Sequence, residues 1–124
     1  MRDGEIALVR VTLAGATPFH DLPGGGVDGG ESETDGLVRE FGEETGLIVR
    51  AGRLIARADQ YMVSVHDGAF NSHGAFFETS VVGVDAALKI EDNHELIWAP
   101  PHSALTLLRH DSHAWAVTAW LRQR

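Results

Sequence analysis

Short apolar runs near the start of the chain predict two extended segments. Residues 5–12, E-I-A-L-V-R-V-T, are rich in β-forming residues and lie between Gly4 and Gly15, so we expect a strand there. Residues 19–22 form a shorter extended segment that leads into Pro23 and a run of glycines. Both segments therefore precede a loop in which the backbone has unusual conformational freedom.

A helix is predicted after this loop. The hydroxyl of Ser32 can cap its first turn, and Asp35 places a negative charge in that turn, where the helix dipole favours it. Gly46 is a natural C-terminal stop. Gly36 and Gly42 each weaken the helix by roughly 1 kcal/mol relative to alanine. The apolar residues of the segment are Leu37, Val38, Phe41 and Leu47.

The second half of the chain alternates between β-rich runs and turn signals. The expected strand segments are residues 48–50, 54–58, 60–65, 75–84 and 95–99. We expect residues 60–65 to continue the strand of residues 54–58. The sequence His66-Asp67-Gly68 is a turn signal, and Pro100 and Pro101 end the last strand.

Two further helices complete the prediction. Residues 103–108 suit a short helix, and a last helix, capped by Asp111 or Ser112, continues through Trp120 and Leu121. Strands before and after a central helix, followed by a C-terminal helix, predict an α/β fold in which helices cover both faces of a mixed β-sheet.

Length and composition suit a single domain that spans residues 1–124. The chain is 44 % hydrophobic, which is enough for one core. Its formal charge is −8 and Lys89 is its one lysine, which argues against a nucleic-acid polymer as partner because phosphate contacts need clustered Lys and Arg. No cysteine is available for disulfides or thiolate metal sites. Since no leader peptide or membrane-spanning run is evident, we expect a cytoplasmic location without membrane contact.

Glycines and carboxylates recur at fixed spacing in the predicted loop and helix. The order is Gly25, five residues, Glu31, seven residues and the run Arg39-Glu40-Phe41-Gly42-Glu43-Glu44-Thr45-Gly46-Leu47. Glu40, Glu43 and Glu44 stand at i, i+3 and i+4, so their carboxylates share one helix face and repel each other. A hard divalent cation such as Mg²⁺ relieves that repulsion. Glycine carbonyls can reach the same ion, and Arg39 can hold a carboxylate bidentately.

Each half of this pattern has an ordinary interpretation when it is met alone. An E-x-x-E-E run is usually a solvated helix face, and a glycine run is usually a loop. The glycines do not form a Walker phosphate loop, because no Gly-Lys-Ser/Thr follows them. The joint spacing of the two halves is far less common by chance, and it favours metal-dependent phosphoryl chemistry.

The loop–helix unit resembles the Nudix box, G-x5-E-x7-R-E-U-x-E-E-x-G-U, in which U is a bulky aliphatic residue. Every fixed position is filled, by Gly25, Glu31, Arg39, Glu40, Glu43, Glu44 and Gly46. Phe41 stands where the family usually has Leu, Ile or Val. The resemblance implies a Nudix-type α/β/α sandwich. Family members commonly have a further strand before the segment that matches residues 5–11, and only residues 1–4 precede that segment here.

The resemblance also implies a chemistry. Nudix hydrolases are metal-dependent pyrophosphohydrolases that cleave a nucleoside diphosphate linked to another group. It implies Mg²⁺ or Mn²⁺ bound by Glu40 and Glu44 with the carbonyl of Gly24 or Gly25, and Glu43 as a further ligand. Arg39 and Glu31 would orient these ligands. Glu40, Glu43 and Glu95 are the candidates for the general base.

Outside the box the candidates are fewer. Residues 92–98 resemble the family segment in which a downstream acid approaches the metal, and Glu95 is the expected acid, with Glu91 and Asp92 as alternatives. Glu78 is expected to face outward from its strand, although it could instead form a wall of the substrate cleft. His110 and His113 lie three residues apart, but no third ligand lies near them in the sequence, so zinc is not expected.

The substrate is the least determined feature. Tyr61 stands where ADP-ribose-type members usually carry Pro, and Ser64 stands where dinucleoside-polyphosphate types often carry Tyr. The S-Q-P-W-P-F-P-x-S run of NADH-type members is missing. By elimination, a MutT-like enzyme for nucleoside or deoxynucleoside triphosphates is favoured. Nucleotide sugars, ADP-ribose and dinucleoside polyphosphates stay open, as do a nucleotide sensor without activity and a homodimer.

Overall fold

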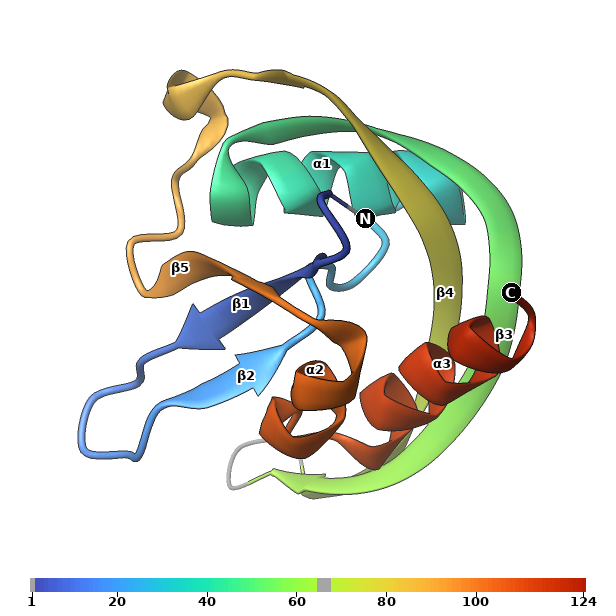
Figure 1. The fold of residues 1–124 in the computed structure, drawn as a ribbon. Helices are drawn as coiled ribbons and strands as arrows, with labels where there is room; N and C mark the ends of the chain where they lie inside the picture. The colour runs from blue at the N-terminus through green and yellow to red at the C-terminus, as the bar shows by residue number, and fades with distance from the viewer. Residues whose placement is uncertain (1, 65–67) are drawn as a thin grey trace.

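The computed structural model describes residues 2–64 and 68–124, and its strands form two antiparallel sheets (Figure 1). The first sheet has the order β2-β1-β5 and contains β1 (Ile6–Val11), β2 (Phe19–Asp21) and β5 (His94–Ala99). The second is a long curved ribbon of β3 (Leu47–Ser64) and β4 (Gly68–Val84), which leads into the short 3₁₀-helix η1 (Ala86–Leu88). The helices are α1 (Glu33–Thr45), α2 (Pro101–Leu107) and α3 (Asp111–Arg122).

Helices pack on both faces of the first sheet, because side chains alternate between the faces of its strands. On one face Leu8 and Ala99 are buried against Ala104, Leu108 and Val117, from α2, the residue after it and α3. On the other face, Ala7, Leu96 and Trp98 pack against a cluster built from Phe41, Leu47 and Val49. Phe41 is itself buried. The predicted α/β/α arrangement is therefore confirmed.

The predicted mixed sheet is corrected. Every strand pair among the described residues is antiparallel, and parallel pairing is limited to an isolated bridge between His20 and Leu108. The strands β3 and β4 follow each other in the chain and pair with each other along most of their length. Register shifts near Val49 and Leu54 bend this ribbon, so that it curves around the molecule and does not extend the first sheet (Figure 1).

Most predicted element boundaries are confirmed within a few residues. The largest difference is β4, which begins at Gly68 instead of residue 75 because residues 68–74 pair with residues 58–64 of β3. Residues 66 and 67 of the predicted turn lie outside the described residues. The helix α2 begins at Pro101, two residues before its predicted start, since proline suits the first helical position.

Of the two predicted N-terminal helix caps, the structure confirms that of α1 and corrects that of α3. Ser32 caps α1 as predicted, because its hydroxyl accepts a hydrogen bond from the Asp35 N–H at 3.1 Å, and Gly46 ends the helix with a left-handed φ of 77°. The predicted cap of α3 was wrong. His110 is the cap residue and makes no side-chain capping bond. Asp111 is instead the first helical residue, where the helix dipole stabilises its negative charge.

Two kinds of element are not found among the described residues. Among the described residues no helix is long and apolar enough to cross a membrane. Within that same part of the chain no strand precedes β1, and Arg2 and Glu5 form only an isolated bridge.

Candidate active site

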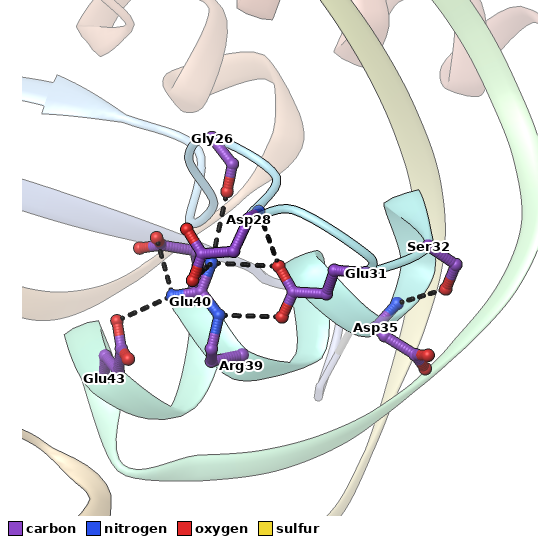
Figure 2. Close-up of polar contacts among 8 residues, drawn as sticks. All are labelled: Gly26, Asp28, Glu31, Ser32, Asp35, Arg39, Glu40 and Glu43. Atoms are coloured by element: carbon purple, nitrogen blue, oxygen red, sulfur yellow. Dashed lines mark hydrogen bonds and ion pairs between the residues drawn. The ribbon is translucent and has the colours of Figure 1, made fainter.

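Arg39 of α1 lies at the centre of a group of acidic side chains (Figure 2). Its Nε donates to Glu31 Oε2 at 2.8 Å, and its Nη1 donates to both Glu40 Oε1 at 3.0 Å and Glu43 Oε2 at 3.1 Å. A further bond of 3.2 Å reaches the carbonyl of Gly26 in the glycine loop. The guanidinium therefore fixes three carboxylates and ties the helix to the loop.

Glu31 anchors the same network from the loop side. One carboxylate oxygen accepts from the Asp28 backbone N–H at 2.9 Å, and both oxygens accept from Arg39 (Figure 2). The hydrogen bond from Arg39, followed by that from Asp28, lowers the pKa of Glu31. In return, the bonds to Glu31 and Glu40 raise the pKa of Arg39. Arg39 and Glu31 are thus placed to orient the other acids.

Glu44 differs from its neighbours because it is buried, with 4 % of its surface exposed. Its Oε1 accepts the Gly24 backbone N–H at 3.2 Å. Burial raises the pKa of Glu44 to about 8, against the lowering effect of that bond, and the charges of Glu40 and Glu91 raise it further. Without a cation, Glu44 is therefore mostly protonated at neutral pH.

The glycine loop approaches the acids so closely that side chains would not fit. A Cβ atom on Gly25 would lie 3.0 Å from Glu40 Cδ, and Arg39 holds that carboxylate in place. Gly24 has a φ of +142°, a conformation that other residues rarely adopt. The structure thus brings Gly24 and Gly25 beside Glu40 and Glu44, as the spacing predicted.

The downstream acids are placed differently from the expectation. Glu95 pairs with Arg10 across the β1–β5 ladder and shares the sheet face of Leu8 and Ile97, opposite the face that packs against α1. The structure does not bring Glu95 to the acid group. It brings Glu91, whose backbone N–H donates to the Glu43 carbonyl at 3.1 Å and whose charge acts on Glu44. Asp92 is exposed in the turn that follows.

The donor set fits a hard divalent cation. It consists of carboxylates and backbone carbonyls, and buried Glu44 would regain its charge beside a cation. In the part of the chain that the structure describes, no three such side chains already converge as a closed metal cage. Arg39 occupies oxygens of Glu40 and Glu43. Mg²⁺ does not require a closed cage, because it commonly uses one or two carboxylates with waters and substrate phosphates.

A cavity of about 820 Å³ opens beside this group. Its lining includes the glycine loop, Trp98, consecutive residues 72–81 of β4 and the start of α3. Glu78 lines it, which corresponds to the alternative that placed this residue in a cleft wall. Its Oε1 accepts from Trp120 Nε1 at 3.0 Å and from Arg53 at 3.1 Å.

Sequence reasoning missed Asp21, which also lines the cavity. The fold supplies the third ionisable group that His110 and His113 lacked in the sequence, because Asp21 at the end of β2 lies within 4 Å of both imidazoles. The one sequence signal was an acidic residue directly before the Leu22-Pro23-Gly24 turn.

Comparison with known proteins agrees with this geometry. A family model described as the NUDIX domain matches residues 1–121. The fold is similar to "NUDIX hydrolase from Nitrosomonas europaea", with 19 % identity, a TM-score of 0.81 and coverage of 98 % of this chain and 83 % of that one. It is similar to the MutT protein from Methanosarcina mazei Go1, with 25 % identity, a TM-score of 0.74 and coverage of 98 % and 86 %.

A third similar structure is that of a UDP-X diphosphatase. The two sequences are 20 % identical and the TM-score is 0.68, with coverage of 100 % of this chain and 60 % of that one. No match was found among curated protein sequences.

Proposed function

This chain belongs to the Nudix hydrolase family, since the domain model spans nearly all of it, and we propose that its substrates are nucleoside or deoxynucleoside triphosphates. Nudix hydrolases generally use divalent metal ions and act on small-molecule nucleotides. The observation that carries the proposal is that buried Glu44 and Glu40 lie against the glycine loop, which in turn lines a large cavity.

Glu44 and Glu40 are the proposed metal ligands, with Glu43 as a further ligand and a carbonyl of Gly24 or Gly25 completing the set. A bound Mg²⁺ or Mn²⁺ would supply charge neutralisation on the phosphates and a water of lowered pKa. The glycine loop has no side chains in the way of the diphosphate, so the backbone can approach it closely. These residues therefore bind and orient the scissile group.

Arg39 and Glu31 are the proposed positioning residues. The bonds from Arg39 to Glu40 and Glu43 hold these carboxylates at the mouth of the loop, and Glu31 fixes the guanidinium in turn. For the general base we retain Glu40 and Glu43 and replace Glu95 by Glu91, because Glu91 lies on the α1 side of the molecule. The base must accept the proton of the attacking water at one carboxylate oxygen.

Three considerations support a triphosphate substrate. The sequence lacks the marks of the ADP-ribose, dinucleoside-polyphosphate and NADH subfamilies. The structural similarity includes a MutT protein at 25 % identity. The negative charge of the protein requires cations at the diphosphate, which suits a metal-chelated triphosphate.

The proposal is tested by a substrate panel with Mg²⁺ and phosphate detection, followed by reaction in ¹⁸O-water. We expect a nucleoside triphosphate to give a monophosphate and pyrophosphate, with the label in the monophosphate. Faster turnover of ADP-ribose or a nucleotide sugar would overturn the substrate and leave the enzyme class. If no diphosphate is cleaved while nucleotides raise the melting temperature, the protein is a sensor.

A further inference from the structure

The segment that leads into the glycine loop is attached to α3 by a hydrogen bond between residues far apart in the chain. The N–H of Leu22, which precedes Pro23 and the loop, donates to Nδ1 of His113, 91 residues later, at 3.1 Å. A second bond joins the same regions, because the Arg109 N–H donates to the carbonyl of His20 at 3.0 Å. The end of β2 and the residue after it are therefore held against the start of α3.

The imidazole of His113 is fixed in the orientation that accepts the bond from Leu22. It lies edge to face against Phe76 of β4, with ring centroids 5.5 Å apart, and against His110, with centroids 5.2 Å apart. Burial lowers the pKa of His113 to about 4, against the raising effect of the Asp21 charge, so the ring is neutral at pH 7. Its proton is then on Nε2, and Nδ1 remains an acceptor.

Pro23 makes the connection between this bond and the proposed metal ligands stiff. Its ring fixes its own φ and also restricts the backbone of the preceding residue, Leu22. The next residue, Gly24, donates its N–H to Glu44 Oε1 at 3.2 Å. A displacement of Leu22 would therefore move the backbone that contacts the buried acid of α1.

Loss of the acceptor on His113 would cause such a displacement. The side chain of Leu22 packs against the core cluster that includes Leu8, Ala104 and Val117, so this residue cannot simply turn towards water. Its N–H would be left without the partner that the structure gives it, and an unpaired backbone donor away from water costs free energy. The backbone around Leu22 would shift to satisfy this group, and the glycine loop would shift with it.

We propose that His113 is a positioning residue for the metal site, because its hydrogen bond to the Leu22 backbone holds the glycine loop against Glu44. The inference rests on the proposed function, since it takes Glu44 and the carbonyls of the loop as metal ligands. In this role His113 acts through Leu22 and makes no contact with the metal.

Two substitutions of His113 and one matched control test this role. His113→Leu removes the acceptor and keeps a bulky side chain, whereas His113→Asn keeps an acceptor, because the Asn Oδ1 can take the place of Nδ1. The control is Gln60→Leu. Gln60 Oε1 accepts the Ser112 N–H at 2.9 Å, so it ties the same turn of α3 to β3 and not to the glycine loop. Urea unfolding should show that both leucine variants lose stability.

Calorimetric titration with Mn²⁺ alone separates positioning from stability. We expect His113→Leu to raise the Kd for Mn²⁺ about fivefold, which corresponds to about 1 kcal/mol, the net value of one hydrogen bond. His113→Asn and Gln60→Leu should stay within twofold of the wild type. A rise below threefold in His113→Leu would overturn the inference, and so would an equal rise in either of the other variants.

Hydrogen exchange in the wild-type protein tests the same coupling if His113→Leu does not fold. By thermodynamic linkage, a bond that strengthens metal binding is strengthened by the metal to the same degree. Saturating Mg²⁺ should therefore slow exchange of the Leu22 amide about fivefold, measured by NMR, and slow that of the Ser112 amide far less. No slowing at Leu22, or equal slowing at the two amides, would overturn the inference.

Neither measurement needs turnover, so the inference and the proposed function can fail separately. If no triphosphate is hydrolysed but Mn²⁺ affinity depends on the acceptor at position 113, the substrate proposal is wrong and the role of His113 stands. If triphosphates are hydrolysed and Mn²⁺ binds the wild type and His113→Leu equally well, the inference is wrong and the proposed function stands.

Discussion

Two groups of ionisable side chains lie next to the segment from Asp21 to Gly26, which lines the cavity, and they differ in how their hydrogen bonds are satisfied. Around Arg39 the carboxylates of Glu31, Glu40 and Glu43 have donors from a single short segment of chain. Around Asp21 the partners come from a helix about ninety residues later, and they leave Asp21 Oδ1 without a hydrogen bond among the described residues. The first group is held together by its own hydrogen bonds, whereas in the second both imidazoles lie just beyond hydrogen-bond distance of Asp21 Oδ1.

The same contrast explains what the sequence could predict. The Arg39 group was predictable because its members lie within one loop and helix, where i, i+3 and i+4 spacing fixes the geometry. The Asp21 group depends on where β2 ends and α3 begins in space, which no local pattern encodes. The main strands and helices were also predictable from the sequence, because local propensity determines whether a segment forms a strand or a helix.

Tertiary pairing explains the errors. Glu95 was chosen for its place before Trp98, but the β1–β5 register turns it to the face opposite α1. The mixed sheet failed for a similar reason, because the bend of the β3–β4 ribbon depends on register shifts that the sequence does not mark. The cap of α3 failed because Asp111 is already helical.

The largest expected effect is at Glu44, the buried acid beside the Arg39 group. Glu44→Gln should lower kcat by about a thousandfold or more, because it removes a proposed metal ligand and with it charge neutralisation of the transition state. Steady-state kinetics at saturating Mg²⁺ measures the change, with circular dichroism to confirm folding. Glu33→Gln, at an exposed acid of the same helix, is the control. Less than a tenfold loss in Glu44→Gln would remove Glu44 from the ligand set.

Arg39→Lys tests whether the hydrogen bonds of Arg39 position the carboxylates of Glu40 and Glu43. Lysine keeps the charge but cannot bond several carboxylates with a planar fork, so kcat should fall by about ten- to a hundredfold. KM should change less, because Arg39 is not proposed to contact substrate. The matched control is Arg57→Lys, since Arg57 also bonds carboxylate oxygens bidentately, those of exposed Glu33. Equal losses in the two variants would argue against a positioning role.

Metal binding should compete with a proton on Glu44. The pKa of this group is about 8 in the folded metal-free protein and near 4.5 when unfolded, so the native state holds more protons between these values. Stability of the metal-free protein should therefore fall as pH rises from 4.5 to 8. The apparent affinity for Mg²⁺ or Mn²⁺ should rise by about fiftyfold between pH 6 and pH 8.

Calorimetry in buffers of different ionisation enthalpy measures the proton that leaves. We expect release of nearly one proton per bound metal at pH 7, and none attributable to this site in Glu44→Gln. The melting temperature should also rise with millimolar metal, because the ion binds the native state. Metal affinity that is flat across pH 6 to 8 would contradict a protonated Glu44.

The smallest expected effect belongs to the Asp21 group and concerns stability. Burial lowers the pKa of His113 to about 4 in the folded protein, whereas the unfolded chain titrates near 6.5. Between these values the unfolded state binds more protons, so the free energy of unfolding falls as pH drops through this window. Because Glu44 titrates in the opposite sense over the same range, the loss is measured in the Glu44→Gln background, where it should be about 1–2 kcal/mol from pH 7 to pH 5 by urea unfolding. A protonated His113 would also lose its bond from Leu22, because Nδ1 would no longer accept. His113→Asn should flatten the slope, and His73→Asn, at an exposed site, should keep it. If both variants keep the wild-type slope, His113 is not the group that titrates, and the contrast between the Arg39 group and the Asp21 group would rest on hydrogen bonding alone.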